Sequence, residues 1–171
     1  VVAYLAVLGV GAIAVPLNPA SPPPEIEREL AVVGARLALV GPTAGRRMAA
    51  LGPGALDGFD GAVAVGDLLD GEPAPIVPRE PDDVAVLLFT SGTVGAPRPA
   101  MLTHGNLRSN IEQILAHPTR PQGPDEVALA VLPLFHVFGL NAVLGVALHI
   151  GGSVVLVERF DPHSTLEDIA A

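Results

Sequence analysis

Short apolar runs alternate along this sequence with segments that can form amphipathic helices, and this alternation limits the chain to a few architectures. Strands that alternate with helices are typical of layered α/β folds. Half of the 171 residues are apolar, so the chain can bury a substantial core. The sequence therefore predicts an α/β fold in which layered mixed sheets have flanking helices.

In the first part of the chain, the clearest expected helix is Pro23–Val33. Prolines and acidic residues stand near its start, Ser21 precedes it as a candidate cap, and Gly34 follows its last turn. The other elements expected here are a helix at 2–9, an extended segment at 12–16, a strand at 37–40, a helix at 43–51, a strand at 62–65 and a helical turn at 67–69.

A proline-rich, acidic segment, residues 71–83, is expected to cross the surface as an extended connector between substructures of one partial domain, residues 1–171. The elements expected after it are strands at 84–89 and 100–103, a helix at 104–116, a strand at 127–131, a mostly apolar helix at 135–149, a strand at 153–157 and the start of a helix at 162–171.

Composition excludes several classes of partner. The net charge of −9 opposes binding to nucleic acid or to an anionic membrane surface. The sequence has no cysteine, so it carries no disulfide and no thiolate metal site, which is typical of a cytoplasmic protein. The apolar first 16 residues are interrupted at Gly9 and Gly11, which favours a buried helix and a strand over an integral membrane segment.

The segment 90–99, TSGTVGAPRP, follows the expected strand 84–89 and forms a small-residue loop. Taken alone, its first six residues are typical of an ordinary surface connection. Short hydroxyl-bearing residues and glycines also allow successive N–H groups to converge on an anion, and Arg98 adds a planar, permanent positive charge. A phosphate chain is the ligand that this chemistry suits best. The chain contains no lysine, so the GxxxxGK[ST] phosphate loop is excluded.

The longer stretch resembles the phosphate-loop motif TSGTTGxPKGxxxTH of the adenylate-forming superfamily, which includes acyl-CoA synthetases, peptide-synthetase adenylation domains and luciferases. Eight of its eleven specified positions match. The resemblance implies that the phosphates of ATP contact Thr90, Ser91, Gly92, Thr93, Val94, Gly95 and Arg98. It implies that Pro97, Thr103 and His104 support the loop.

Three positions depart from the motif. Val94 replaces a threonine, which removes a hydroxyl but leaves the backbone N–H. Arg98 replaces a lysine and keeps the charge while changing its shape. Pro99 replaces a glycine, which fixes φ and deletes a donor. We expect these departures to reduce activity.

A second motif lies in VLPLFHVFGLN, residues 131–141, which places His136 where a strand passes into a helix. A lone histidine in apolar surroundings is more often a satisfied core residue than a catalytic one. The run resembles, however, the PLFHxxG motif of the acyl- and aryl-CoA ligases of the same superfamily. The resemblance implies a catalytic His136 beside the acyl carboxylate and the thiol, with Phe135, Phe138 and Gly139 shaping the pocket. The run contains no acidic residue to meet a substrate ammonium group, which favours a fatty or aryl acid over an amino acid.

The remaining histidines have structural interpretations. His117 and His163 lie in polar loops, and His149 ends an apolar helix, where it can complement the helix dipole. No pair has metal-ligand spacing, so no metal site is expected within this segment.

The resemblance implies a reaction in two steps. A carboxylate attacks the α-phosphate of ATP to give an acyl-adenylate and pyrophosphate, and the thiol of coenzyme A then displaces AMP. The Mg²⁺ ligand and a C-terminal domain with a catalytic lysine are expected beyond residue 171, so the isolated segment is expected to have little activity. The partners implied are a carboxylic acid, ATP, coenzyme A and the remainder of the parent chain. The alternative is a truncated or decayed module that is not catalytic and binds nucleotide weakly at most.

Overall fold

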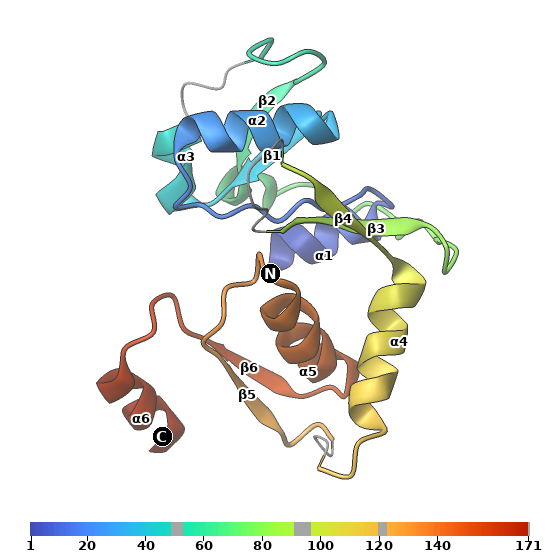
Figure 1. The fold of residues 1–171 in the computed structure, drawn as a ribbon, viewed down its shortest axis with the longest axis vertical. Helices are drawn as coiled ribbons and strands as arrows, with labels where there is room; N and C mark the ends of the chain where they lie inside the picture. Colours follow the sequence, from blue (N-terminus) through green and yellow to red (C-terminus); the bar gives the residue numbers. More distant parts are fainter. Residues whose placement is uncertain (49–52, 91–96, 120–122, 171) are drawn as a thin grey trace. The chain divides into compact units, whose positions relative to one another are not determined.

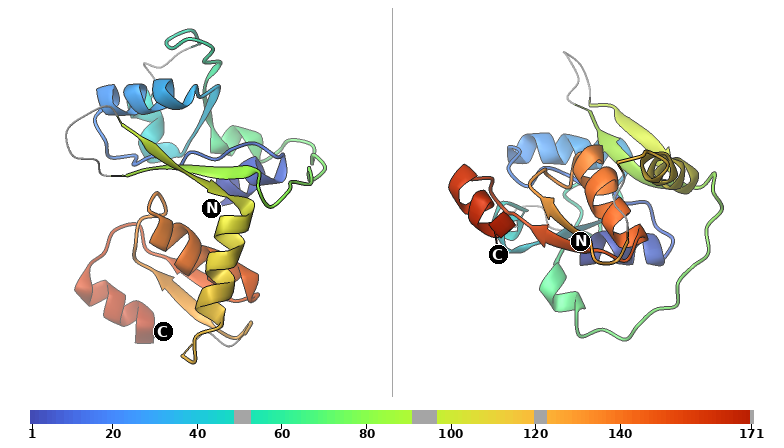
Figure 2. Two further views of the ribbon diagram at one scale, coloured as in Figure 1. Left: turned by 45° about the vertical axis from the view of Figure 1, so that its right-hand side comes forward. Right: turned by 90° about the horizontal axis from the view of Figure 1, so that it is seen from below.

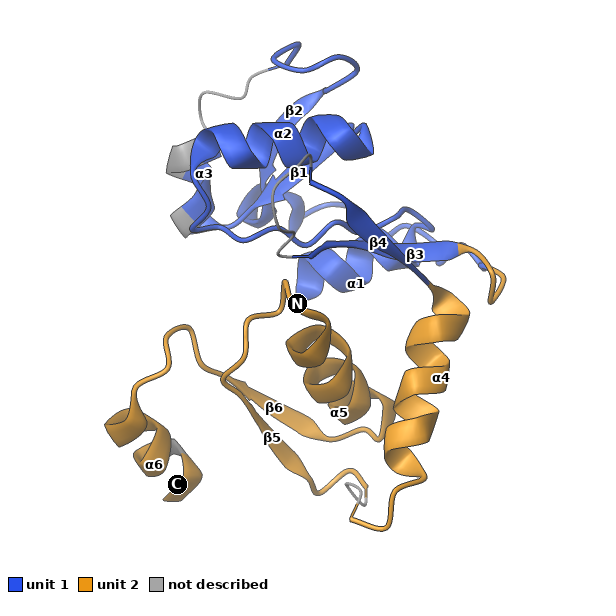
Figure 3. Cartoon of the chain, in the orientation of Figure 1, with its two compact units in different colours: residues 1–79, 84–102 blue, residues 80–83, 103–171 orange. Residues whose placement is uncertain are grey.

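The computed structural model describes residues 1–48, 53–90, 97–119 and 123–170. It consists of small sheets with helices between their strands. Within these ranges the strands pair as β1 with β2, β3 with β4, and β5 with β6 (Figure 1). The chain divides into two compact units (Figure 3). Unit 1 contains residues 1–79 and 84–102, and unit 2 contains residues 80–83 and 103–171. The predicted α/β class is confirmed.

The first layer of unit 1 is a parallel strand pair with its own apolar core. Its elements are α2 (Pro23–Val33), β1 (Leu37–Val40), α3 (Pro42–Met48) and β2 (Gly61–Ala64). β1 and β2 run parallel with Leu37 opposite Gly61, and the connection between them contains α3, as parallel pairing requires. The core of this layer consists of Ile26, Leu30, Val40, Met48 and Phe59.

Helix α2 has the predicted bounds, but its cap differs from the prediction. Its N-cap is Pro22, and the Ser21 hydroxyl donates instead to the Glu25 carboxylate at 3.2 Å. Pro23 and Pro24 fill the first two positions and have no N–H, so a serine cap has few donors to satisfy. The helix ends at Gly34, whose φ of 60° lies in the left-handed region.

The turn η1 (Val65–Leu68) follows β2 and contacts it, so it belongs with the first layer. The second layer of unit 1 contains α1 (Val2–Gly9), β3 (Val84–Phe89) and β4 (Pro99–Thr103). Helix 2–9 and strand 84–89 are confirmed. Segment 12–16 is not a full strand, because only Ala14 bridges to Val86 of β3, and Pro16 lacks the N–H that a longer ladder would need. The Ala14 N–H donates to the Ala85 carbonyl at 2.9 Å.

The other boundaries of unit 1 differ by small shifts. The strand expected at 62–65 is β2, the turn expected at 67–69 is η1, and the helix expected at 43–51 is α3, with residues 49–52 outside the described part. Residues 71–82 are exposed, and segment 71–83 contains no helix or strand, so its role as a connector stays a prediction. This segment is held where the Val77 N–H donates to the Gly9 carbonyl at 2.8 Å and where the Arg79 guanidinium donates to the Gly11 carbonyl.

Unit 2 contains a second parallel pair, with Val127 of β5 opposite Ser153 of β6. Its elements are α4 (His104–Leu115), β5 (Val127–Ala130), η2 (Phe138–Gly145), α5 (Val146–His149), β6 (Ser153–Leu156) and α6 (Pro162–Ala170). Helices η2 and α5 form the crossover from β5 to β6, and α4 packs against η2 (Figure 2). In the described part of the chain, no helix is both long and apolar enough to cross a bilayer.

The apolar helix expected at 135–149 differs from the prediction in its start and in its geometry. It begins at Phe138, runs as a π-helix to Gly145, and becomes α-helical only over Val146–His149. The residues before it fold as a turn, in which the His136 N–H donates to the Pro133 carbonyl at 3.1 Å. The turn brings the carbonyls of Leu132 and Pro133 so close to residue 139 that a Cβ would not fit there, which requires a glycine at this position.

Candidate functional site

The phosphate-loop motif lies between β3 and β4, which are neighbours in one sheet. Thr90 follows β3 and is exposed, and Arg98 is exposed directly before β4. Ser91, Gly92, Thr93, Val94 and Gly95 lie outside the described residues, so their predicted phosphate contacts stay predictions. The strand that precedes this connection, β3, is well packed, since Ala85 and Val86 are fully buried.

Pro99, the departure from the family's glycine, is the first residue of β4. Proline is tolerated at the first position of a strand. Pro97 and Pro99 are both half-buried and flank the exposed Arg98. The strand can therefore begin at Pro99 without breaking its pairing with β3.

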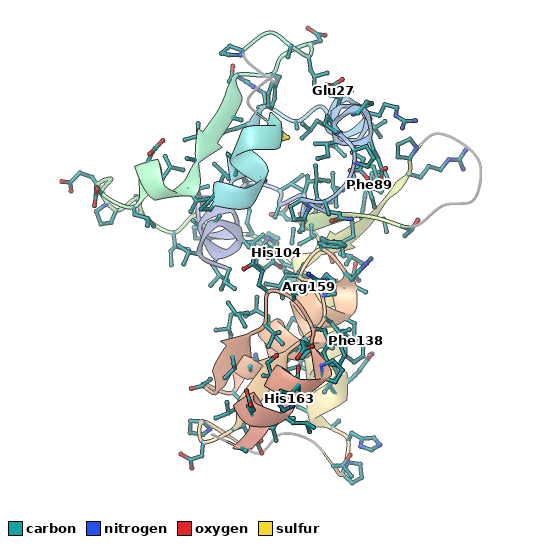
Figure 4. All side chains as sticks on the ribbon, turned by 90° about the vertical axis from the view of Figure 1, so that its left-hand side faces the viewer. Glu27, Phe89, His104, Phe138, Arg159 and His163 are labelled. Carbon is teal, nitrogen blue, oxygen red and sulfur yellow. The ribbon has the colours of Figure 1, made fainter. Side chains whose placement is uncertain are left out.

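The end of the motif forms the start of α4. Thr103 is the N-cap, and its hydroxyl accepts from the Asn106 N–H at 3.1 Å. The Asn106 side chain accepts in return from the Thr103 N–H at 3.1 Å, which completes a capping box. His104, labelled in Figure 4, is the first residue of the helix, and its N–H donates to the Asp83 carbonyl at 3.0 Å. These contacts give Thr103 and His104 a structural role at the start of α4, and their support of the phosphate loop stays a prediction.

Gly105 adds a contact that the sequence did not predict. Its N–H donates to the Pro81 carbonyl at 2.7 Å, and a Cβ at this position would lie 2.9 Å from the same oxygen. The first turn of α4 is thus pressed against residues 81–83, and only glycine allows that approach. The one indication of this contact in the sequence is a glycine in the first turn of the expected helix.

The second motif occupies the passage from β5 to η2. The side chain of His136 is exposed, and its ring lies 4.6 Å from the ring of Phe135, centroid to centroid, at an interplanar angle of 51°. Phe138, labelled in Figure 4, is 60% exposed. The interpretation of His136 as a satisfied core residue does not fit this structure.

The close packing around residue 139 explains why the second motif has a glycine there. A Cβ at Gly139 would lie 2.6 Å from the Pro133 carbonyl oxygen and 2.9 Å from that of Leu132. Any side chain would push the start of η2 away from the turn that carries His136. Gly139 is therefore a packing residue for this turn.

Asn141 is a residue that the motif did not single out. It is 5% exposed, and its Nδ2 donates to the Leu107 carbonyl at 3.1 Å and to Asn110 Oδ1 at 2.9 Å. Both acceptors belong to α4. In the sequence, the one indication of this buried contact is a single amide side chain within the apolar run FGLNAVLG.

His117 lies in a loop and His149 near the end of a helix, as predicted, but His163 is the second residue of α6 (Pro162–Ala170) and not a loop residue. His117 Nδ1 lies 2.9 Å from the Thr119 hydroxyl, His163 lies 3.5 Å from Glu167 in an exposed pair, and His149 is in the last turn of α5. Among the residues that the structure describes, no group of three or more His, Asp or Glu side chains could hold a metal ion.

An apolar hollow of about 260 Å³ lies between β5 and the crossover helix, away from the motif residues. Its lining includes Val127, Leu129, Val143, Val146 and Ile150. None of the predicted site residues lines it. The hollow therefore adds nothing to the candidate site at His136.

Comparison with known proteins gives consistent matches. The family model of AMP-binding enzymes matches residues 1–171. A feruloyl-CoA synthase of Amycolatopsis sp is 40% identical over 93% of this chain and 31% of its own length. The 4-coumarate–CoA ligase 1 of Oryza sativa subsp. japonica is 33% identical over 94% of this chain and 32% of its own length. The crystal structure of ATP-bound MatB from Rhodopseudomonas palustris has a TM-score of 0.84 and 29% identity, over 98% of this chain and 34% of that one. The chain thus spans about a third of the length of the curated relatives it matches.

Proposed function

The chain belongs to the family of AMP-binding enzymes, and from that membership we propose that it is part of an ATP-dependent acyl-CoA ligase. The proposed reaction joins a carboxylic acid to AMP with release of pyrophosphate, and then transfers the acyl group to coenzyme A with release of AMP. One observation carries the proposal: two relatives that match more than nine-tenths of the chain, at 40% and 33% identity, are CoA ligases by name.

The proposed task of the loop between β3 and β4 is electrostatic. A carboxylate and a polyphosphate repel each other, so the first step needs positive groups already in place around the phosphate oxygens. Thr90 and Arg98 are exposed at the two ends of the connection. We assign the leaving pyrophosphate to Arg98, the Thr90 hydroxyl and the N–H groups of residues 91–95.

The proposed acyl and thiol site is at the turn before η2. His136 is accessible there, Phe135 packs against its ring, and Phe138 presents an apolar surface. We assign His136 to the acyl carboxylate and the incoming thiol, as the catalytic residue of this segment. Gly139 allows the start of η2 to lie close to the Pro133 carbonyl, where a side chain would not fit.

The proposed substrate is an aryl or fatty acid. Residues 131–141 contain no carboxylate that could meet a substrate ammonium group, which argues against an amino acid. The names of the relatives, a feruloyl-CoA synthase and a 4-coumarate–CoA ligase, support testing aryl acids first.

Mg²⁺ is expected in this chemistry, but the described residues do not fit it, since they include no cluster of potential metal ligands. We therefore place its ligand in the remainder of the parent chain. The C-terminal domain with its lysine belongs to the same remainder. For these reasons we expect little ligase activity from the 171 residues alone.

The experiment that tests the function is an acid panel on the full-length protein. Ferulic, 4-coumaric and medium- and long-chain fatty acids are each incubated with ATP and Mg²⁺, and AMP release is measured with and without coenzyme A. We expect AMP release that depends on both the acid and coenzyme A. Nucleotide binding without acid-dependent AMP release from any acid would instead support a non-catalytic module.

A further inference from the structure

The side chain of Asn141 is buried in the apolar helix η2, and both hydrogens of its amide NH₂ group are used. Nδ2 has two hydrogens, and these are donated to the Leu107 carbonyl and to Asn110 Oδ1 of α4. A carbonyl oxygen can only accept, so the NH₂ group must face Leu107. Burial of an amide is unfavourable unless such bonds form, which makes this contact specific rather than incidental.

The neighbouring sequence makes room for the amide. A Cβ at Gly145 would lie 2.9 Å from Asn141 Oδ1 and 3.3 Å from Ile111 Cδ1 of α4. The wide π-helical turn runs through the same residues, with the Val146 N–H bonded to the Asn141 carbonyl. π-helical turns are often found at functional sites.

The contact lies one helical turn from the candidate catalytic residue. The Leu140 N–H donates to the His136 carbonyl at 3.0 Å. Gly139 is in close contact with the Pro133 carbonyl on the other side of His136. A displacement of Asn141 would therefore pass directly to the turn that carries His136.

α4 is held independently of this contact. Its first turn has the capping box of Thr103 and Asn106, and the Gly105 N–H donates to the Pro81 carbonyl at 2.7 Å. Loss of the Asn141 bonds would thus move the segment 132–141 and leave the start of α4 in place.

We propose that Asn141 is a positioning residue that fixes the segment carrying His136 against α4, and so sets the geometry of the acyl site. The catalytic meaning of this proposal rests on the proposed ligase function. The structural part, that Asn141 holds residues 132–141, stands on the described contacts alone.

The kinetic test uses the full-length protein with Asn141→Leu, which keeps a similar size and removes both donors. We expect the KM for the best acid to rise roughly ten-fold, the effect of one buried hydrogen bond, while the KM for ATP stays within about two-fold. Val40→Ala, in the apolar core of the first layer, is the matched control. It lowers stability as well, but it should leave the acid KM unchanged, because a smaller folded fraction lowers the rate and not the KM.

A pair of substitutions at Asn110 tests the hydrogen bond itself. Asn110→Asp keeps an oxygen that accepts from Asn141 Nδ2, whereas Asn110→Leu removes the acceptor. We expect the aspartate variant to keep the wild-type acid KM and the leucine variant to raise it. Equal acid KM values in the two variants would contradict the proposal. This pair also decides the question if Asn141→Leu does not fold.

Hydrogen exchange measured by mass spectrometry gives a result that does not depend on activity. We expect faster exchange over 132–141 in Asn141→Leu and unchanged exchange there in Val40→Ala. Unchanged exchange in both variants overturns the inference. A wild-type protein without acid-dependent AMP release overturns the ligase function instead, and the exchange result still decides whether Asn141 positions this segment.

Discussion

The two parallel strand pairs of this chain have the same topology, but the contacts that pack each pair against its helices differ. In the pair β1–β2, the crossover contains α3, and the layer is completed by an apolar cluster in which Phe59 and Ile26 are nearly inaccessible. In the pair β5–β6, the crossover contains η2 and α5, and the contact with α4 includes the buried amide of Asn141. Apolar packing gives stability without direction, whereas hydrogen bonds select one arrangement. The layer that carries the candidate catalytic residue is the one with the directional contact.

The largest expected effect tests the apolar layer. Phe59→Ala removes a buried ring from the cluster, and such truncations cost about 3–5 kcal/mol. We expect thermal unfolding of unit 1 at a markedly lower temperature, with faster hydrogen exchange over α2 and β1. The conservative Phe59→Leu should lose much less. An acid KM that changed in Phe59→Ala would break the contrast between the two layers.

At His136 we expect the opposite pattern, a loss of activity without a loss of stability. Because the side chain is exposed, His136→Ala should leave thermal stability unchanged, while the loss of a general acid or base lowers kcat by about 100-fold or more. The rate of AMP release in the full-length protein measures this. His149→Ala, in the last turn of α5, is the control and should keep the wild-type rate. Equal rates in both variants would remove His136 from the catalytic site.

A smaller effect is expected at the cap of α4. Thr103→Ala removes the acceptor for the Asn106 N–H, which typically costs about 1 kcal/mol. We expect faster hydrogen exchange in the first turn of α4, and Thr103→Ser should restore protection because serine keeps the hydroxyl. Protection lost equally in both variants would show that the capping hydroxyl is not what holds this helix.

The smallest effect concerns the pH dependence of the first layer. Burial raises the pKa of the Glu29 carboxyl, the charge of Glu25 raises it further, and Arg28 opposes the change. Since the folded state holds this proton more tightly than the unfolded chain, ionised Glu29 destabilises the fold as the pH rises from the unfolded value, 4.5, through the folded one. Glu29→Gln should therefore stabilise the protein more at pH 7 than at pH 4. A stability difference that is independent of pH would contradict this.

Elements with strong local signals were predictable from the sequence. Helix Pro23–Val33 and strand Val84–Phe89 have the predicted bounds, because prolines, glycines and unbroken apolar runs act within a few residues. The cap at Ser21 was wrong because two prolines remove the donors that a cap would satisfy.

Contacts between distant residues were not predictable in the same way. The helix expected from residue 135 starts at Phe138, because the residues before it form a turn in which the His136 N–H donates to the Pro133 carbonyl. The partners of Asn141 are 31 and 34 residues away in the sequence, so no local pattern reports them. The motif at 131–139 identifies His136 and Gly139, but it does not include Asn141, whose amide is bonded to α4.

Helix α4 serves both motifs: its first residues finish the phosphate-loop pattern, and its middle accepts the amide of Asn141. An α-helix turns by about 100° for each residue. One residue inserted between His104 and Leu107 would therefore rotate both acceptors away from η2 while leaving every residue of the two motifs intact. The spacing along this helix is thus as much a part of the site as the residues that a motif search would find.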